Sequence, residues 1–221
     1  MRKFHLALAT LPLLVACGPA RAAITQTATF SGLNLAIPDG NASGLADARV
    51  FTSAITSIES VEVSVDIAGT FNGDLYAYLT NGSGFAVLLN RTGVTGGNAF
   101  GYDNDGFSVA FSDTAANGDI PTYQTLTNPG TGVAVSGLWQ PDARAVDPSV
   151  VTDGSVRSAF LSSFNGSSAD GLWTLYVADM VTGDAHVLTG WSVTVTGVPE
   201  PGSLGLLALG LATALVRRRS A

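Results

Sequence analysis

The feature that most constrains the fold of this chain is a run in which apolar and polar residues alternate. In Val61–Ile67 every second residue is Val or Ile, and Glu62, Ser64 and Asp66 lie between them. Successive side chains of a strand point to opposite sides of a sheet, so this run is typical of a strand with one buried face. Helical periodicity is absent between the two chain ends. The chain is therefore predicted to be all-β.

Further short strands are predicted where apolar runs lie between turn residues. Asn72-Gly73 and Asn81-Gly82 are typical hairpin turns, so the runs around them are expected to be antiparallel. Two runs that begin with tryptophan near the C-terminus are expected to form a final hairpin with their indoles in the core. Together these runs predict an antiparallel β-sandwich. Besides Val61–Ile67, the expected strands are Thr25–Phe30, Leu75–Thr80, Phe85–Asn90, Phe107–Phe111, Trp173–Asp179 and Trp191–Thr196.

Residues 1–23 have the composition of an export signal peptide. Arg2 and Lys3 form a charged start, and an apolar stretch follows. Ala20-Arg21-Ala22 is a small-x-small cleavage site, which places cleavage after Ala22 or Ala23. The mature domain then spans residues 24–197.

The only cysteine, Cys17, leaves a second interpretation of this segment open. Leu14-Val15-Ala16-Cys17 has the form of a lipoprotein box, in which the cysteine becomes lipidated. In both interpretations the mature domain has no disulfide. Its stability outside the cell must then come from core packing, metal binding or both.

The C-terminal residues 198–221 combine a proline-bracketed glutamate, an uncharged run and three arginines. The run Gly202–Val216 has 15 residues without a charge. As a helix it would be about 22 Å long. A helix that spans a bilayer usually has roughly 20 residues, so this run is short for a span. The arginines would stay on the cytoplasmic side. We therefore predict a C-terminal hydrophobic helix that acts as a transient anchor in the inner membrane.

This arrangement of Val-Pro-Glu-Pro, a short hydrophobic segment and a terminal arginine cluster resembles the PEP-CTERM sorting signal of Gram-negative bacteria. The resemblance implies recognition by an exosortase-type membrane protease-transpeptidase, which cleaves near the Pro-Glu-Pro box. It also implies a final location at the cell surface or outside the cell. The sorting-signal residues are Pro199, Glu200, Pro201, Arg217, Arg218 and Arg219.

The domain between the two ends is strongly acidic. From Ile24 to Val198 there are four arginines, no lysine and 16 acidic residues, a net charge of 4 − 16 = −12. Such a surface repels nucleic acid and anionic lipid, so no nucleic-acid partner is expected. It suits calcium, which prefers oxygen ligands, but an acidic surface also keeps secreted proteins soluble. Both interpretations stay open.

A loop with two carboxylates is the first candidate calcium site. Asp103 and Asp105 precede Gly106 with the spacing of an EF-hand loop. The first and twelfth ligand positions, however, fall on Gly101 and Ser112, neither of which supplies a carboxylate. The two aspartates could contribute to a site completed elsewhere, or could form an Asx-type turn.

The order of motifs from Ile58 to Thr196 resembles the P domain, or P/Homo B domain, of subtilisin-like proprotein convertases. The motifs include Phe71-Asn72-Gly73-Asp74-Leu75, Asp170-Gly171-Leu172-Trp173 and Gly190-Trp191-Ser192-Val193. The resemblance implies a jelly-roll-like β-sandwich that stabilises a protease in the convertases and also occurs alone on secreted bacterial proteins. Its recurrent aspartates, Asp74 and Asp179, are interpreted either as turn caps or as calcium ligands. Residues 117–156 are longer than a compact P domain needs.

The chain itself is predicted to be non-catalytic. It has two histidines, His5 in the signal peptide and His186, which is expected in a surface loop without a nucleophile motif. The leading hypothesis is an exported surface or matrix protein. The alternatives are an accessory P domain for a separate subtilisin-like peptidase, and a lectin-like module. In the lectin hypothesis, extracellular polysaccharide would stack on loop aromatics, for which the candidates are Tyr102, Tyr123 and Trp139.

Overall fold

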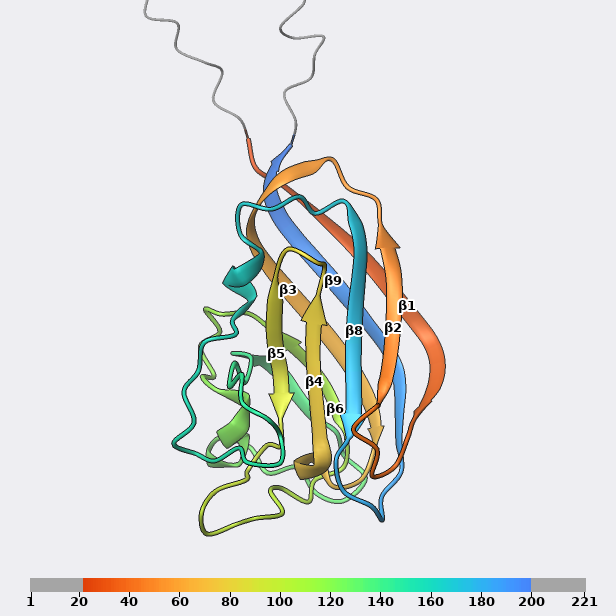
Figure 1. The fold of residues 1–221 in the computed structure, drawn as a ribbon, viewed down its shortest axis with the longest axis vertical. Coiled ribbons are helices and arrows are strands. Elements are labelled where there is room, and N and C mark those ends of the chain that lie inside the picture. Colours follow the sequence, from red (N-terminus) through yellow and green to blue (C-terminus); the bar gives the residue numbers. More distant parts are fainter. Residues whose placement is uncertain (1–21, 200–221) are drawn as a thin grey trace, which may run out of the picture.

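The described part of the chain consists of two β-sheets packed face to face (Figure 1). The structure is a computed structural model, and it describes residues 22–199. The strands are β1 (Ile24–Ile37), β2 (Leu45–Phe51), β3 (Ile55–Gly69), β4 (Leu75–Thr80), β5 (Phe85–Asn90), β6 (Phe107–Phe111), β7 (Val135–Trp139), β8 (Gly171–Asp179) and β9 (His186–Pro199). Three short 3-10 helices are η1 (Asn72–Asp74), η2 (Ile120–Thr125) and η3 (Leu161–Phe164).

One sheet has five strands in the order β1-β9-β3-β6-β7, and the other has four in the order β2-β8-β4-β5. The alternation in β3 gives the five-stranded sheet its buried face, because Val63 and Val65 point inward and pair with Val193 and Trp191 of β9. Trp173 covers the core from the opposite sheet. The predicted all-β sandwich is confirmed.

One of the two predicted Asn-Gly hairpins is confirmed and the other is wrong. Asn81-Gly82 joins β4 to β5, which pair antiparallel. Asn72-Gly73 lies in η1, which carries the chain from β3 in one sheet to β4 in the other. The local residues favour a turn in both places, but a turn can join strands of different sheets as well as neighbours in one sheet.

The predicted tryptophan hairpin is also wrong. β8 pairs with β2 and β4, whereas β9 pairs with β1 and β3. Trp173 and Trp191 are each 1% exposed and belong to opposite sheets. The prediction that both indoles lie in the core is confirmed. An alternating strand specifies which face is buried, but it does not specify the sheet to which the strand belongs.

The five-stranded sheet contains one parallel pair, β6 with β7. Parallel neighbours need a long crossover connection, and residues 112–134 provide it here. This crossover and residues 91–106 and 140–160 form the long loops beside β5 and β4 in Figure 1. Neither β2 nor β7 was predicted.

The two described ends of the chain lie together at one end of the sandwich (Figure 1). Ile24 of β1 pairs with Gly197 of β9, and Ala22 and Ala23 are exposed just before β1. Within residues 22–199, no helix is long and apolar enough to cross a membrane. The predicted signal peptide up to Arg21 and the hydrophobic run Gly202–Val216 lie outside the described residues.

Candidate functional site

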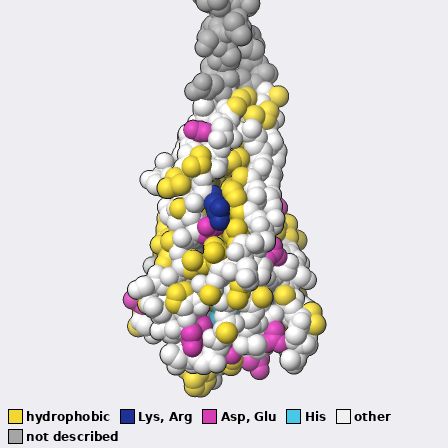
Figure 2. Space-filling model, turned by 90° about the vertical axis from the view of Figure 1, so that its right-hand side faces the viewer, with side chains coloured by type: hydrophobic (Ala, Val, Ile, Leu, Met, Phe, Trp, Pro, Cys, Tyr) yellow, Lys and Arg dark blue, Asp and Glu magenta, His cyan; other side chains and the backbone are white. Residues whose placement is uncertain are grey.

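The end of the sandwich opposite the chain ends holds a buried ionic group that we call the aspartate–histidine cluster: Asp74, Asp179 and His186, with Arg91 beside them. Asp74 directly precedes β4, and its neighbour Leu75 pairs with Asp179, the last residue of β8. His186 begins β9. Three strand ends from both sheets therefore bring these side chains together. Viewed from the side of β1 and β2, acidic side chains gather mainly in this half of the molecule (Figure 2).

The tightest contact of the cluster joins the histidine to one carboxylate. His186 Nδ1 lies 2.8 Å from Asp179 Oδ2, and both side chains are fully buried. Gly69 lets the ring approach the backbone, because a Cβ at that position would lie 2.5 Å from His186 Cδ2. Its φ of 151° also favours glycine. The prediction that His186 lies in a surface loop is wrong, since β9 begins earlier than its alternating residues indicate.

Two buried atoms of the cluster have no hydrogen-bond partner. These are Asp74 Oδ1 and His186 Nε2. The nearest cation to Asp74 is Arg91, whose Nη2 lies 3.8 Å from Oδ1, beyond hydrogen-bond distance. Buried polar atoms are normally paired, so this cluster is incompletely satisfied.

Burial gives Asp74 an unusual protonation equilibrium. Its pKa is raised to about 6, first by desolvation and then by the negative charge of Asp179, while Arg91 opposes the shift. Asp184 raises the pKa further, and His186 lowers it. Asp74 thus changes charge near neutral pH, within a cluster whose histidine faces the interior. A general base must reach a substrate, and the buried His186 Nε2 is not accessible to one.

The four predicted calcium ligands are not gathered in one place. Asp74 and Asp179 lie in the cluster, where Asp179 Oδ1 also accepts the backbone N–H of Val181, as a turn cap does. Asp103 is exposed, and the carboxylate of Asp105 accepts the backbone N–H of Gly132. Within residues 22–199, no group of three or more His, Cys, Asp or Glu side chains is arranged to hold a metal ion. Calcium binding stays a prediction, which a melting temperature unchanged by millimolar calcium would contradict.

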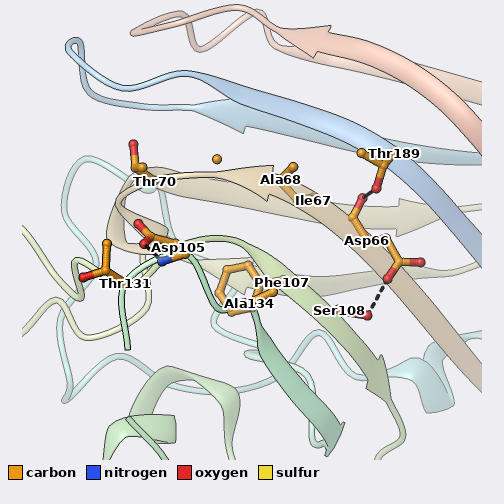
Figure 3. A pocket seen from close by; sticks show the side chains of 12 residues that line it. Asp66, Ile67, Ala68, Thr70, Asp105, Phe107, Ser108, Thr131, Ala134 and Thr189 are labelled. Carbon is orange, nitrogen blue, oxygen red and sulfur yellow. Dashed lines mark hydrogen bonds between the residues drawn. The ribbon is translucent and has the colours of Figure 1, made fainter. Parts of the chain in front are cut away.

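A groove of about 500 Å³ runs along the outer surface of β3 and β6 (Figure 3). Asp105 and Thr131 lie at one end, and Asp66 and Ser108 at the other. Its carboxylates are already engaged, because Asp66 Oδ1 accepts the Ser108 hydroxyl at 2.7 Å and Asp105 accepts Gly132 N–H. The groove therefore presents hydroxyls and paired carboxylates.

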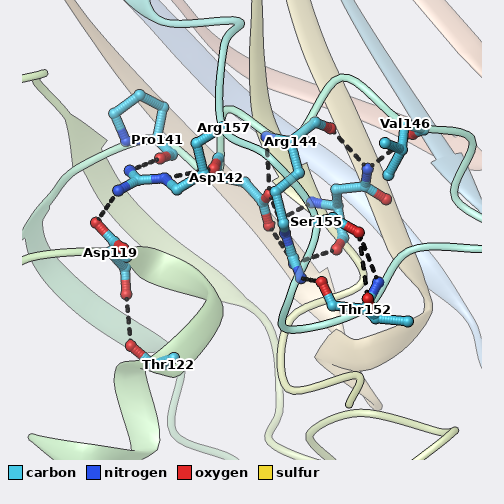
Figure 4. Close-up of polar contacts among 10 residues, drawn as sticks. Asp119, Thr122, Pro141, Asp142, Arg144, Val146, Thr152, Ser155 and Arg157 are labelled. Atoms are coloured by element: carbon cyan, nitrogen blue, oxygen red, sulfur yellow. Dashed lines mark hydrogen bonds and ion pairs between the residues drawn. The ribbon is translucent and has the colours of Figure 1, made fainter. Parts of the chain in front are cut away.

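A second buried ionic group, which we call the Arg144 cluster, holds the long loops against β5 (Figure 4). Arg144 Nε and Nη2 each donate to the Asp142 carboxylate at 2.7 Å. The same guanidinium donates to the carbonyls of Asn90 at 2.7 Å and Thr152 at 2.8 Å. Burial raises the pKa of Asp142, while hydrogen bonds from Arg144 and its charge oppose that shift. No sequence motif pointed to this cluster.

Arg157 extends this network to the crossover loop. It donates to the carbonyls of Asp142 and Pro141 at 2.9 and 2.8 Å, and it forms an ion pair with Asp119 (Figure 4). Its guanidinium also lies 5.0 Å from the ring centroid of Phe160. Arg157 thereby ties together distant parts of residues 117–156, whose length the P-domain resemblance did not explain. The segment joins the sandwich through β7, which pairs with β6, and through the Arg144 contact with Asn90 of β5.

The aromatic residues of the lectin hypothesis do not form an exposed surface. Tyr123 is fully buried and Trp139 is 2% exposed. Tyr102 packs edge-on against Tyr123, with ring centroids 4.8 Å apart. This choice of residues was wrong because Trp139 lies in β7 and Tyr123 in η2, where both side chains belong to the core, and Tyr102 packs against that core.

The predicted cleavage box is continuous with the central strand β9. Pro199, the first proline of the box, still pairs with Ile55 of β3, and Val198 pairs with Ser57. Glu200, Pro201 and Arg217, Arg218 and Arg219 lie outside the described residues. The sandwich therefore leads into the box without a separate linker.

Comparison with known families identifies this tail. The PEP-CTERM protein-sorting motif matches residues 197–219. The motif implies export, sorting to the cell surface or the exterior, and recognition by an exosortase-type enzyme, which confirms that part of the sequence prediction. The match covers only the end of the chain, so it assigns no family to the sandwich.

Comparisons with whole proteins give less. No curated protein sequence matches this chain. Among solved structures, the complex of the Aeromonas sobria serine protease (ASP) with the chaperone ORF2 is similar at 17% identity and a TM-score of 0.43. The match covers 82% of this chain and 28% of that chain, so this chain spans under a third of that protein's length. The P-domain resemblance stays a prediction.

Proposed function

We propose that this chain is an exported, non-catalytic protein of the cell surface or extracellular matrix, presented there by an exosortase-type enzyme as a P-domain-like β-sandwich. The observation that carries the proposal is the match of residues 197–219 to the sorting motif, directly after strand β9. In this proposal the sandwich is the exported domain, and the tail is its sorting signal. The buried position of His186 supports a non-catalytic role.

The geometry of β9 supports a specific form of processing. Because Pro199 pairs with Ile55, a cut after the box releases the complete sandwich. The two strands that flank β9 hold it by antiparallel pairing over most of its length, so the sandwich does not depend on the tail for its fold. The anchor is then transient, and the mature protein lacks the terminal arginines.

Intact-mass analysis of the mature protein tests this proposal. We expect the protein from an exosortase-positive host to lack Arg217–Arg219 and the protein from an exosortase deletion strain to keep them. Glu200→Ala in the box should also block processing, whereas the control Glu62→Ala, an exposed strand residue, should not. A mature protein that retains the arginines in the positive host would contradict the proposal.

A further inference from the structure

The outer face of the four-stranded sheet carries three tyrosines side by side. Tyr76 and Tyr78 lie on β4, and Tyr176 on β8 pairs with Tyr78. The rings of Tyr78 and Tyr176 stack with centroids 4.6 Å apart and planes at 16°, and Tyr76 meets Tyr176 edge-on at 6.3 Å. Phe85 of β5 extends the group, 5.0 Å from Tyr78. We call these four residues the aromatic row. Figure 1 looks onto this sheet.

A hollow of about 380 Å³ opens beside the aromatic row, a size typical of small-ligand sites. All three tyrosines line it, together with Ser43 and Asp147, which supply polar groups. Burial raises the pKa of Tyr76 to about 12, so its phenol is neutral at physiological pH. Hydrogen bonds from the hydroxyl and backbone N–H of Ser149 lower the pKa of Asp147, so its carboxylate is an ionised acceptor.

Apart from Asp147, the sheet surface beneath the hollow carries no charged side chain, although the molecule as a whole is acidic. Sixteen acidic residues and four arginines lie between Ile24 and Val198, but the outward positions of β8 and β4 carry none of them. The net negative charge repels an anionic polymer. A cationic partner would bind to the acidic side chains, and most of these lie away from this surface. Aromatic rings with neutral hydroxyls match a ligand that has apolar faces and many hydroxyls. The outward positions are Leu172, Thr174, Tyr176, Tyr76, Tyr78 and Thr80.

We propose that the aromatic row binds a neutral polysaccharide. A pyranose ring packs its C–H groups against the three tyrosine side chains that line the hollow, and its hydroxyls bond to Ser43 and Asp147 at the edge of the hollow. This inference deepens the proposed function and rests on it for the setting, because export brings the sandwich to extracellular polysaccharide. Binding in solution does not depend on sorting, so the two proposals can fail separately.

Affinity electrophoresis and calorimetry with defined polymers test the inference. The probes are hydroxyethyl cellulose and galactomannan as neutral chains, and alginate as an anionic chain. The full-length chain is used in a zwitterionic detergent, because detergents with sugar headgroups would compete for the hollow. We expect binding to at least one neutral polymer and none to alginate. Tyr78→Ala and Tyr176→Ala should each weaken binding roughly tenfold or more, as the loss of a central aromatic contact does.

Phe100→Ala is the matched control, because Phe100 is an exposed aromatic residue outside the row. It should leave the affinity unchanged, and thermal melts should show all three variants folded. Binding of neither neutral polymer, or binding that both tyrosine variants retain, would overturn the inference. So would sedimentation showing a dimer that Tyr78→Ala dissociates without any polymer binding, because the row would then be a contact between two copies.

Discussion

The Arg144 cluster and the aspartate–histidine cluster both bury charged groups, yet they differ in how completely those groups are paired. In the first, one guanidinium meets a carboxylate with two hydrogen bonds and also bonds two carbonyls. In the second, the nearest guanidinium nitrogen lies 3.8 Å from Asp74 Oδ1, and Asp74 Oδ1 and His186 Nε2 have no hydrogen-bond partner. A buried charge that is fully hydrogen-bonded to its counter-ion holds the surrounding chain in one conformation. A buried carboxylate that lacks such hydrogen bonds has a shifted pKa, which makes the stability of the fold depend on pH.

The positions of the two clusters match this difference. The Arg144 cluster holds loops that have little regular structure of their own, so their order depends on its hydrogen bonds. The aspartate–histidine cluster lies where three regular strands already end together, so strand pairing carries the structure there. The end of the sandwich can therefore tolerate charged groups with incomplete hydrogen bonding, whereas the loops cannot.

The largest expected effect comes from removing the arginine of the paired cluster. Arg144→Met leaves the Asp142 carboxylate buried without its partner, which should lower the free energy of unfolding by about 3–5 kcal/mol. Chemical denaturation measures this change. Arg49→Met is the matched control, since Arg49 also makes two contacts to an aspartate two residues earlier but is 37% exposed. It should cost about 1 kcal/mol or less, and equal costs for both variants would contradict the comparison.

The next largest effect concerns the contact between His186 and Asp179 in the aspartate–histidine cluster. His186→Ala removes the partner of Asp179 Oδ2 and should cost about 2–4 kcal/mol. In an Asp179→Asn background no buried charge is left behind, so the same change should cost about 1–2 kcal/mol less. A double-mutant cycle by denaturation measures this coupling. Simple additivity would show that the contact contributes no specific energy.

Asp74→Asn, unlike the two changes above, should raise the free energy of unfolding at neutral and higher pH. With a pKa of about 6 in the folded chain against 3.8 for an ordinary aspartate, Asp74 binds its proton more tightly when folded. Its contribution to stability is therefore greatest below pH 3.8 and is lost as the pH rises through 6. The variant should be more stable than the parent by about 1–3 kcal/mol at pH 8 and lose that advantage near pH 4.

Denaturation of both proteins from pH 4 to pH 8 measures the Asp74 effect. The control is Asp153→Asn, an exposed loop aspartate, which should follow the parent across this range. A parent and an Asp74→Asn variant with parallel pH profiles would show that Asp74 is paired in solution, and the contrast between the two clusters would then disappear.

The strands were predictable because their burial pattern is local. Alternation in Val61–Ile67 predicted the centre of β3, and the burial of Trp173 and Trp191 followed from the same rule. β2 was missed because its inward position Asp47 is polar and its outward neighbours are alanines. The Asp47 carboxylate is satisfied by Trp191 Nε1 at 2.7 Å, a partner far away in the sequence.

Neither cluster could be predicted from the sequence, because each cluster joins residues that are far apart in the chain and meet only in the folded structure. Asn90 donates its side-chain amide to the carbonyl of Arg144, 54 residues away, and no spacing rule connects two such residues. Asp74 and Asp179 were singled out by resemblance, but their proximity depends on the pairing of β4 with β8. The sorting box was predictable because its recognition depends on the local sequence alone.

The smallest expected effect tests whether the loops depend on geometry or on charge. Arg157→Lys keeps the positive charge near Asp119 but removes the fork that bonds the carbonyls of Asp142 and Pro141. We expect a loss of about 0.5–1.5 kcal/mol and faster amide hydrogen exchange in residues 140–160, with the β-strands unchanged. Arg49→Lys, at an arginine whose side chain is 37% exposed, should change neither quantity. If Arg157→Lys behaves like that control, the ion pair with Asp119 holds the loop and the carbonyl contacts contribute little.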